Sequence, residues 1–310
     1  MKLTRSLFSA LARSRWLRDL AVGARPARSL SRRFVAGERL DEAIAVARVL
    51  NEKSLYATLD HLGENVTSET EARDATIEVL ELLDGIESEG VRSGVSIKLT
   101  QLGLDLSPSL ALDNLERIVA HAAALQRFVR IDMENHSHVQ ITLDLFHELW
   151  RRYRNLGVVI QSYLYRSIDD ITRLIEVGAS VRLVKGAYDE PAEVAHSEKD
   201  KTDAAYVLIM EQLFSDRAAS NATFPAIATH DPELIDWAKD HTNRRGIPPE
   251  SFEFQMLYGV RVDLQRQLVA EGYRVRAYVP YGSHWYPYLM RRMAERPANI
   301  AFLLRNLSRG

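Results

Sequence analysis

The 310-residue sequence contains no cysteine. This absence excludes disulfide bonds, thiolate zinc sites, cysteine-ligated iron–sulfur clusters and a cysteine nucleophile. The sequence also has no run of about 18 apolar residues, so we expect no helix that spans a bilayer. The formal net charge is −2, which argues against a dedicated nucleic-acid-binding protein, because such domains are strongly basic. The composition, 46% hydrophobic and 26% charged, is that of an ordinary globular protein with a large core.

The first 35 residues differ from the rest of the chain. They are rich in arginine, contain Asp19 as their one acidic residue, and interleave apolar side chains such as Leu7, Phe8 and Trp16. Three interpretations stay open: a transit peptide, an amphipathic helix on a membrane surface, or a helix packed on the following domain. We predict a basic N-terminal helical segment at residues 1–35 and one domain at residues 36–310.

Short runs rich in Val, Ile and Tyr alternate with longer amphipathic stretches from residue 54 onward. Strands are expected at residues 55–60, 95–99, 128–133, 158–162, 181–185, 226–229, 252–256 and 275–279. Helical patterns lie at residues 69–87, 110–127, 139–153, 168–177, 204–218, 232–241 and 263–271, and another at 38–52 is expected beneath the strands. Both a doubly wound sheet and a closed (β/α)8 barrel use this alternation. Eight strands, and the lack of a G-x-G-x-x-G motif after a strand, favour an α/β fold of the (β/α)8 TIM-like barrel type.

Charged residues interrupt several of the predicted strands close to their ends. Lys98, Asp132, Arg182 and Lys185 all stand in otherwise apolar runs. Burying a lone charge costs several kcal/mol, so these groups need partners, and Lys98 and Asp132 on neighbouring strands can pair. Other strand ends also carry polar residues: Asp60, His61, Gln101, Glu134, Asn135, Gln161, Thr229, His230, Glu253, Gln255, Tyr278 and Tyr281. Because catalytic groups of barrels gather at these ends, we interpret the set as an active site; a structural ion-pair layer is the alternative for the Lys98–Asp132 pair.

The stretch from Tyr278 to Glu295 leads from the last strand into a helix. On that helix Tyr288, Arg291 and Arg292 share one face, because residues three and four apart are neighbours on a helix. Arginine binds a carboxylate through two parallel hydrogen bonds, so this face suits a small anionic, partly apolar molecule such as an amino acid. A solvated basic helix face is the alternative interpretation.

Two other functional classes compete with this interpretation. Asp60, His61, Asp132, Glu134 and His230 could serve a metal-dependent barrel hydrolase, although only two of them are histidines at strand ends. A barrel that acts as a scaffold or binding protein without catalysis is the third class. The small pair Gly186-Ala187, after a strand that contains Arg182 and Lys185, instead indicates close approach of the backbone to a flat cofactor.

Several motifs together resemble the proline dehydrogenase family, and most closely its short, monofunctional bacterial members. They are residues 96–99 (SIKL), 131–134 (IDME), 159–164 (VIQSYL), 182–188 (RLVKGAY), 228–230 (ATH) and 252–259 (FEFQMLYG), followed by Tyr278, Tyr288, Arg291, Arg292 and Glu295. The resemblance covers about residues 34–305, and the motifs occur in the family's order.

This resemblance implies a flavin-binding catalytic barrel with a C-terminal helix over its mouth. It implies FAD as the cofactor, L-proline as the substrate and 1-pyrroline-5-carboxylate as the product. It further implies a membrane quinone as electron acceptor, handover of the product to a 1-pyrroline-5-carboxylate dehydrogenase, and a cytoplasmic enzyme at the inner face of the membrane. We expect no nucleic-acid partner and no metal.

The resemblance also implies roles for single residues. Asp132 and Arg182 are expected to be catalytic. The proline molecule is expected to contact Lys98, Tyr278, Tyr288, Arg291, Arg292 and Glu295. The flavin is expected to contact Met133, Gln161, Arg182, Val184, Lys185, Gly186, Ala187, Thr229 and His230.

Overall fold

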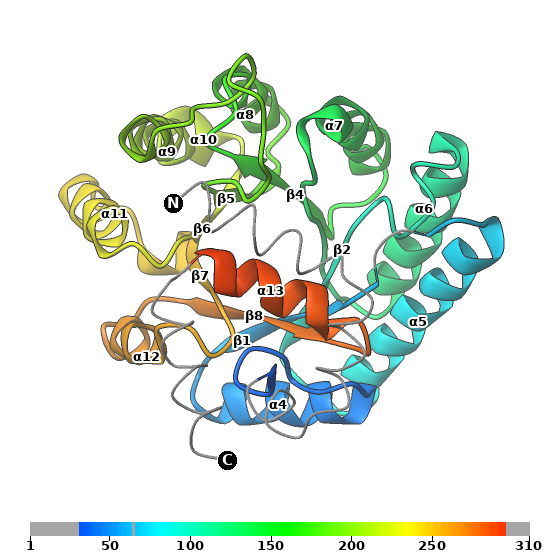
Figure 1. Ribbon diagram of the computed structural model, residues 1–310. Helices are drawn as coiled ribbons and strands as arrows, with labels where there is room; N and C mark the ends of the chain where they lie inside the picture. Colours follow the sequence, from blue (N-terminus) through cyan, green and yellow to red (C-terminus); the bar gives the residue numbers. More distant parts are fainter. Residues whose placement is uncertain (1–30, 64–65, 296–310) are drawn as a thin grey trace.

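A closed barrel of parallel strands forms the centre of the computed structural model, which describes residues 31–63 and 66–295, the last five as backbone alone. Each strand is hydrogen-bonded to the next in sequence order, and the last pairs with the first (Figure 1). The strands are β1 (Tyr56–His61), β2 (Ser93–Ile97), β3 (Val129–Ile131), β4 (Leu156–Gln161), β5 (Ser180–Val184), β6 (Phe224–Ala228), β7 (Glu253–Leu257) and β8 (Val275–Tyr281). All eight predicted strands overlap these, so the predicted (β/α)8 barrel is confirmed.

Helices surround the barrel in a ring (Figure 1). They are α4 (Leu40–Glu52), α5 (Glu69–Ser88), α6 (Pro108–Ala124), α7 (His136–Trp150), α8 (Ser167–Glu176), α9 (Lys199–Leu213), α10 (Asp216–Ser220), α11 (Pro232–Arg245) and α12 (Val262–Ala270), with a 3-10 turn at Pro249–Ser251. The single helix predicted over residues 204–218 is wrong. Ser215 adopts extended backbone and its side chain accepts a hydrogen bond from the Ala218 N–H (3.2 Å), which ends one helix and caps the next.

Alternation along the strands separates an apolar shell from a polar interior. In the register of β1 and β2, Leu59 lies beside Val95 and Asp60 beside Ser96. Leu59 and Val95 belong to the large apolar core, together with helix residues such as Leu82 and Leu115. Since successive side chains of a strand point to opposite faces, Asp60 and Ser96 point into the barrel. The hydrophobic core therefore lies between strands and helices, and the interior is left for polar groups.

Helix α4 occupies a different place from the one expected. It contacts β1, β8 and α5, and so takes the position of a ring helix at the seam where the barrel closes. The expectation that this helix lies beneath the barrel is wrong. Its apolar face, which includes Ala43, Ile44 and Ala47, is buried against the strands.

Helix α13 (Trp285–Glu295) follows β8 and lies across the barrel opening, as the resemblance implied (Figure 1). Its first turns form an apolar cluster with the loop after β1 and with the chain before α4: Phe34, Val35, Leu62, Trp285, Tyr286, Tyr288 and Leu289. We call residues 33–38 the strap. Two backbone bonds of 2.9 Å join the strap to the end of β8, from Ala36 N to Pro280 O and from Gly282 N to Gly37 O. The Trp285 indole donates to Glu38 (3.1 Å), so the strap fixes the start of α13.

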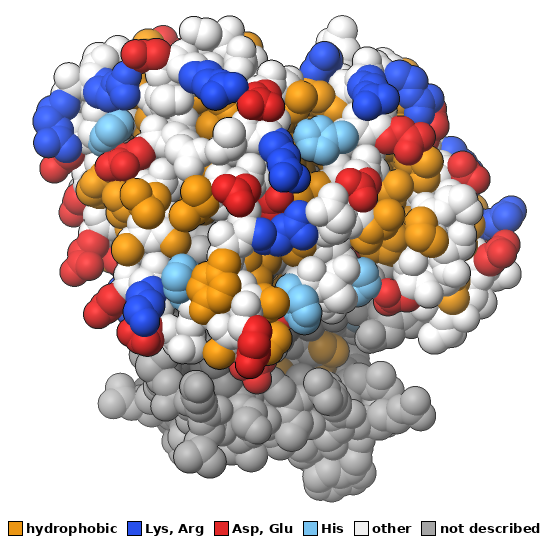
Figure 2. All heavy atoms as spheres, turned by 90° about the horizontal axis from the view of Figure 1, so that it is seen from above, with side chains coloured by type: hydrophobic (Ala, Val, Ile, Leu, Met, Phe, Trp, Pro, Cys, Tyr) orange, Lys and Arg blue, Asp and Glu red, His pale blue; other side chains and the backbone are white. Residues whose placement is uncertain are grey.

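Residues 1–30 of the predicted N-terminal segment lie outside the described residues. Within residues 31–63 and 66–295, no helix is both long and apolar enough to cross a membrane. Figure 2 shows acidic and basic side chains intermingled over one face of the molecule, with hydrophobic side chains scattered among them. That face carries no extended surface of one charge.

Candidate active site

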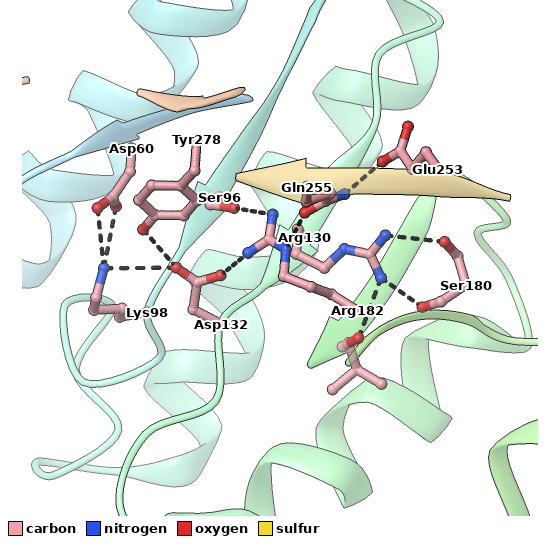
Figure 3. Close-up of polar contacts among 11 residues, drawn as sticks. Asp60, Ser96, Lys98, Arg130, Asp132, Ser180, Arg182, Glu253, Gln255 and Tyr278 are labelled. Atoms are coloured by element: carbon pink, nitrogen blue, oxygen red, sulfur yellow. Dashed lines mark hydrogen bonds and ion pairs between the residues drawn. The ribbon is translucent and has the colours of Figure 1, made fainter. Parts of the chain in front are cut away.

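Asp132 is the centre of a polar network inside the mouth of the barrel (Figure 3). It follows β3, and its Oδ1 lies 2.5 Å from Arg182 Nη1 of β5. Its Oδ2 accepts a hydrogen bond from the Tyr278 hydroxyl of β8 (2.7 Å) and lies 3.7 Å from Lys98 Nζ. Four of the predicted site residues therefore meet, although they come from four different strands.

Lys98 has a second and closer carboxylate partner. Its Nζ lies 3.2 Å from both oxygens of Asp60, which is almost completely buried on β1. Burial raises the pKa of Asp60, while the positive charge of Lys98 acts in the opposite direction. Asp60 was not among the residues predicted to contact proline. Its signal in the sequence was a charge at an inward position of a strand, and its pairing with Lys98 joins the neighbouring strands β1 and β2.

Arg182 directs every side of its guanidinium at a partner. Nε donates to Gln255 Oε1 of β7 (2.5 Å), and Nη2 donates to Ser96 Oγ of β2 (3.0 Å). The guanidinium carbon also lies 5.3 Å from the centroid of the Tyr278 ring. With 5% of its surface exposed and these contacts satisfied, Arg182 has one orientation. Ser96 and Gln255 hold it there; their supporting role was not predicted.

A second polar layer lies nearer the amino ends of the strands, to the right of the first in Figure 3. Glu253 accepts from Arg276 at 2.8 and 3.1 Å and also from Gln255. Burial acts to raise the pKa of Glu253, but Arg276, Gln255 and Arg130 together outweigh it and the net shift is downward. Arg130 donates to the Ser180 carbonyl (2.7 Å) and hydroxyl (3.0 Å). This layer matches a structural ion-pair layer, and it closes the interior below the site.

The ends of β3, β4, β5 and β6 present the residues expected to hold a flavin. Val184, Lys185 and Gly186 are half-buried and Ala187 is exposed, while Met133, Gln161 and Thr229 are buried. The Lys185 ammonium lies 2.8 Å from Asp231 and also pairs with Asp203. His230 Nε2 accepts from the Leu257 N–H (2.9 Å), so a neutral His230 carries its proton on Nδ1.

This set of residues fits a flat cofactor with a polar edge. Gly186 has φ of +119° and no side chain, so backbone is accessible beside a cation. No described residue forms a hydrogen bond with the Gly186 N–H. The Gly186 amide and the Lys185 ammonium after β5, with the Thr229 hydroxyl and the His230 imidazole after β6, suit the polar edge of a ring system.

The residues predicted on α13 are described in part. Tyr288 is buried in the cluster that joins α13 to the strap. The side chains of Arg291, Arg292 and Glu295 lie outside the described part of the chain, so their contacts with substrate stay predictions.

The two histidines at the start of α7 connect neighbouring loops. His136 pairs with Glu190 of the loop after β5, and His138 Nε2 lies 2.7 Å from Asp105 of the loop after β2. Among the residues described, no group of three or more His, Cys, Asp or Glu is arranged to hold a metal ion. Asp60 and Asp132, which the hydrolase alternative needed as ligands, instead contact Lys98 and Arg182.

Comparison with known proteins agrees with the family that the sequence motifs resemble. The family model described as proline dehydrogenase matches residues 43–305. Proline dehydrogenase 1 of Bacillus subtilis is 42% identical over 306 residues, which is 98% of this chain and 99% of the relative. Proline dehydrogenase of Deinococcus radiodurans is 41% identical over 91% of both chains.

A solved structure resembles the barrel as well. It is proline utilization A (PutA) from Bdellovibrio bacteriovorus inactivated by N-propargylglycine, with a TM-score of 0.81 and 29% identity. The match covers 87% of this chain and 33% of that one, so this chain spans about a third of the PutA protein. Nothing in these comparisons supports a metal-dependent hydrolase. The chain belongs to the proline dehydrogenase family.

Proposed function

We propose that this protein oxidises L-proline to 1-pyrroline-5-carboxylate with FAD as its cofactor. The observation that carries the proposal is the network of Lys98, Asp132, Arg182 and Tyr278, in which Arg182 comes from β5, the strand that leads into Lys185 and Gly186. The flavin supplies the acceptor for a hydride from the ring carbon next to the amine. What the protein adds is orientation and charge, because this reaction needs no nucleophile from the chain.

The charge balance of the network explains why helix α13 is needed to bind the substrate carboxylate. Lys98 and Arg182 contribute two positive charges, and Asp60 and Asp132 contribute two negative ones. A neutral network gives little attraction to the carboxylate of an amino acid. Arg291 and Arg292 on α13 would supply the missing charge, and Glu295 would pair with them. A carboxylate held by Lys98 and both arginines would place the proline ring against Tyr278 and Tyr288.

The same residues would control the protonation of the substrate amine and the access of water to the reacting carbon. A cationic site disfavours the protonated amine, and the amine must be unprotonated before it can lose a hydride. Asp132 keeps Lys98 and Arg182 fixed, so neither side chain has to reorganise during the reaction. Helix α13 over the mouth excludes water, and it must move to admit proline.

The partners proposed for the enzyme follow from its family. Electrons would pass from the reduced flavin to a membrane quinone, and the product would be taken up by a 1-pyrroline-5-carboxylate dehydrogenase. In the basic segment of residues 1–35, the part before the strap would hold the enzyme at the inner face of the membrane, and residues 36–310 would form the flavin-binding catalytic domain.

An absorbance spectrum of the purified protein tests the proposal. We expect a yellow protein with flavin bands that bleach when L-proline is added without oxygen. D-proline and L-valine serve as controls and should leave the bands unchanged. A colourless protein that contains zinc would contradict the proposal and support the hydrolase alternative.

A further inference from the structure

Glu190 is a buried carboxylate outside the network described above. It lies in the loop that joins β5 to α9, the same loop that begins with Lys185, Gly186 and Ala187. Its side chain is 3% exposed, whereas that of Glu198 near the end of the same loop is 63% exposed. A buried carboxylate is costly unless donors surround it, so its contacts indicate what it does.

Donors from two elements converge on Glu190. The backbone N–H of His136 donates to Oε1 (2.8 Å), and the His136 ring pairs with Oε2. His136 is the first residue of α7, where N–H groups lack acceptors within the helix and the helix dipole favours a negative charge. The Tyr163 hydroxyl, from the segment after β4, lies 3.4 Å from Oε1. Glu190 thus joins its loop to both α7 and Tyr163.

Tyr163 lies directly behind the turn expected to contact the flavin. A Cβ added to Gly186 would be 2.3 Å from two carbons of the Tyr163 ring, so the ring touches the Gly186 backbone. The Tyr163 N–H donates to the Lys185 carbonyl (2.9 Å), and its own carbonyl accepts from the His196 N–H (2.8 Å). Burial raises the pKa of Tyr163, which keeps its hydroxyl protonated and able to donate. Tyr163 therefore supports both ends of the loop.

We infer that Glu190 is a positioning residue that acts through Tyr163 to fix the backbone of Gly186 and Ala187 for the flavin. The inference rests on the proposed function, because it assigns the flavin to this turn. A preformed backbone loses less conformational freedom on binding, so it binds the cofactor more tightly than a mobile one. Glu190 contributes this order without touching the flavin itself.

Titration of flavin-free protein with FAD tests the role of Glu190. Glu190→Ala should weaken FAD binding roughly tenfold, as expected for loss of one charge-assisted hydrogen bond, and should shift the flavin midpoint potential. Glu190→Gln keeps an acceptor for the His136 N–H and should restore most of the affinity. Glu198→Ala is the matched control in the same loop and should bind FAD as the unchanged protein does.

Two further variants keep the test decisive if Glu190→Ala does not fold. Tyr163→Phe removes the hydroxyl and keeps the ring, and His136→Ala keeps the backbone N–H and removes the imidazole. Each should weaken FAD binding less than tenfold. FAD affinity and potential unchanged in all variants that fold would overturn the inference, while proline oxidation by the unchanged protein would leave the proposed function intact. An unchanged protein that binds no flavin would instead refute the proposed function.

Discussion

Asp132 receives hydrogen bonds from Arg182 and Tyr278 and lies beside Lys98, so one carboxylate orients three candidate active-site side chains. Each of those side chains keeps at least one additional contact, for example Lys98 with Asp60 and Arg182 with Ser96. The geometry of the site therefore depends on Asp132, while the fold around it has other supports.

Asp132→Asn keeps the size of this side chain and removes its charge. We expect a loss of about 3 kcal/mol in the free energy of unfolding, because the Arg182 charge stays buried without its closest counter-charge. Proline turnover should fall while FAD is retained, because most residues expected to contact the flavin follow β4, β5 and β6. Arg182, which is also expected to contact the flavin, keeps its bonds to Gln255 and Ser96. Urea unfolding, kcat and flavin content measure these effects. Asp105→Asn, on the surface beside His138, is the control and should change none of them.

Tyr278 limits the space over the network with its ring. Tyr278→Ser removes that ring and should lower the preference for L-proline over hydroxyproline by roughly tenfold, because a small change in pocket size is worth about that much. The ratio of the kcat/KM values for the two substrates measures it. The exposed Tyr165 gives the control variant Tyr165→Ser. A ratio that stays constant in Tyr278→Ser would show that another residue discriminates.

Strand β7 gives the barrel interior a dependence on pH through Glu253. The pKa of Glu253 is lowered in the folded protein from its ordinary value of 4.5. The pairing of Glu253 with Arg276 therefore stabilises the fold fully at pH values above 4.5. That stability is lost as the pH falls through the lower folded value.

Glu253→Gln should therefore be less stable at pH 7, by about 3 kcal/mol, because Arg276 loses a buried counter-charge. The difference from the unchanged protein should shrink below pH 4.5. Urea unfolding at several values between pH 7 and pH 3.5 measures this. Glu271→Gln breaks a surface pair with Lys239 and should cost little at any pH. A constant difference at all pH values would contradict the assignment.

Elements were predictable from the sequence wherever periodicity was strong. All eight strands were predicted, because each is a short apolar run before an amphipathic helix. The break at Ser215 was missed, since one capping serine inside a long helical pattern leaves the periodicity intact. The place of α4 was also missed, because contacts with β8 form only when the barrel closes.

The sequence predicted most residues of the polar network, but fewer of the contacts between their side chains. Lys98 and Asp132 were expected to pair because their strands are neighbours in sequence. The contact of Lys98 with Asp60 also joins neighbouring strands, but it was not predicted. The bond between Asp132 and Tyr278 connects the ends of β3 and β8, so the relative height of these two residues depends on the stagger of the strands around the barrel. No local pattern contains that stagger.

For the whole molecule, binding of flavin should couple to stability. A ligand that binds the folded state alone stabilises it by about 2.7 kcal/mol at a hundred times its dissociation constant. FAD at a hundred times its dissociation constant should therefore raise the free energy of unfolding of the flavin-free protein by about 2.7 kcal/mol, measured by urea unfolding. NAD+ at the same concentration is the control, because the sequence lacks the G-x-G-x-x-G motif after a strand. Equal stabilisation by both would contradict a flavin-specific site.

The strap has a consequence for how the chain folds. Glu38 and Trp285 are 247 positions apart in sequence, and β1 and β8 are separated almost as widely. Contacts this distant form late, because the entropy of closing a long loop must be overcome before they contribute. Phe34 and Val35 therefore lack most of their apolar partners until the segment from residue 285 has been synthesised. A ribosome-bound or truncated chain would expose this apolar strap, and association of such chains through it competes with closure of the barrel.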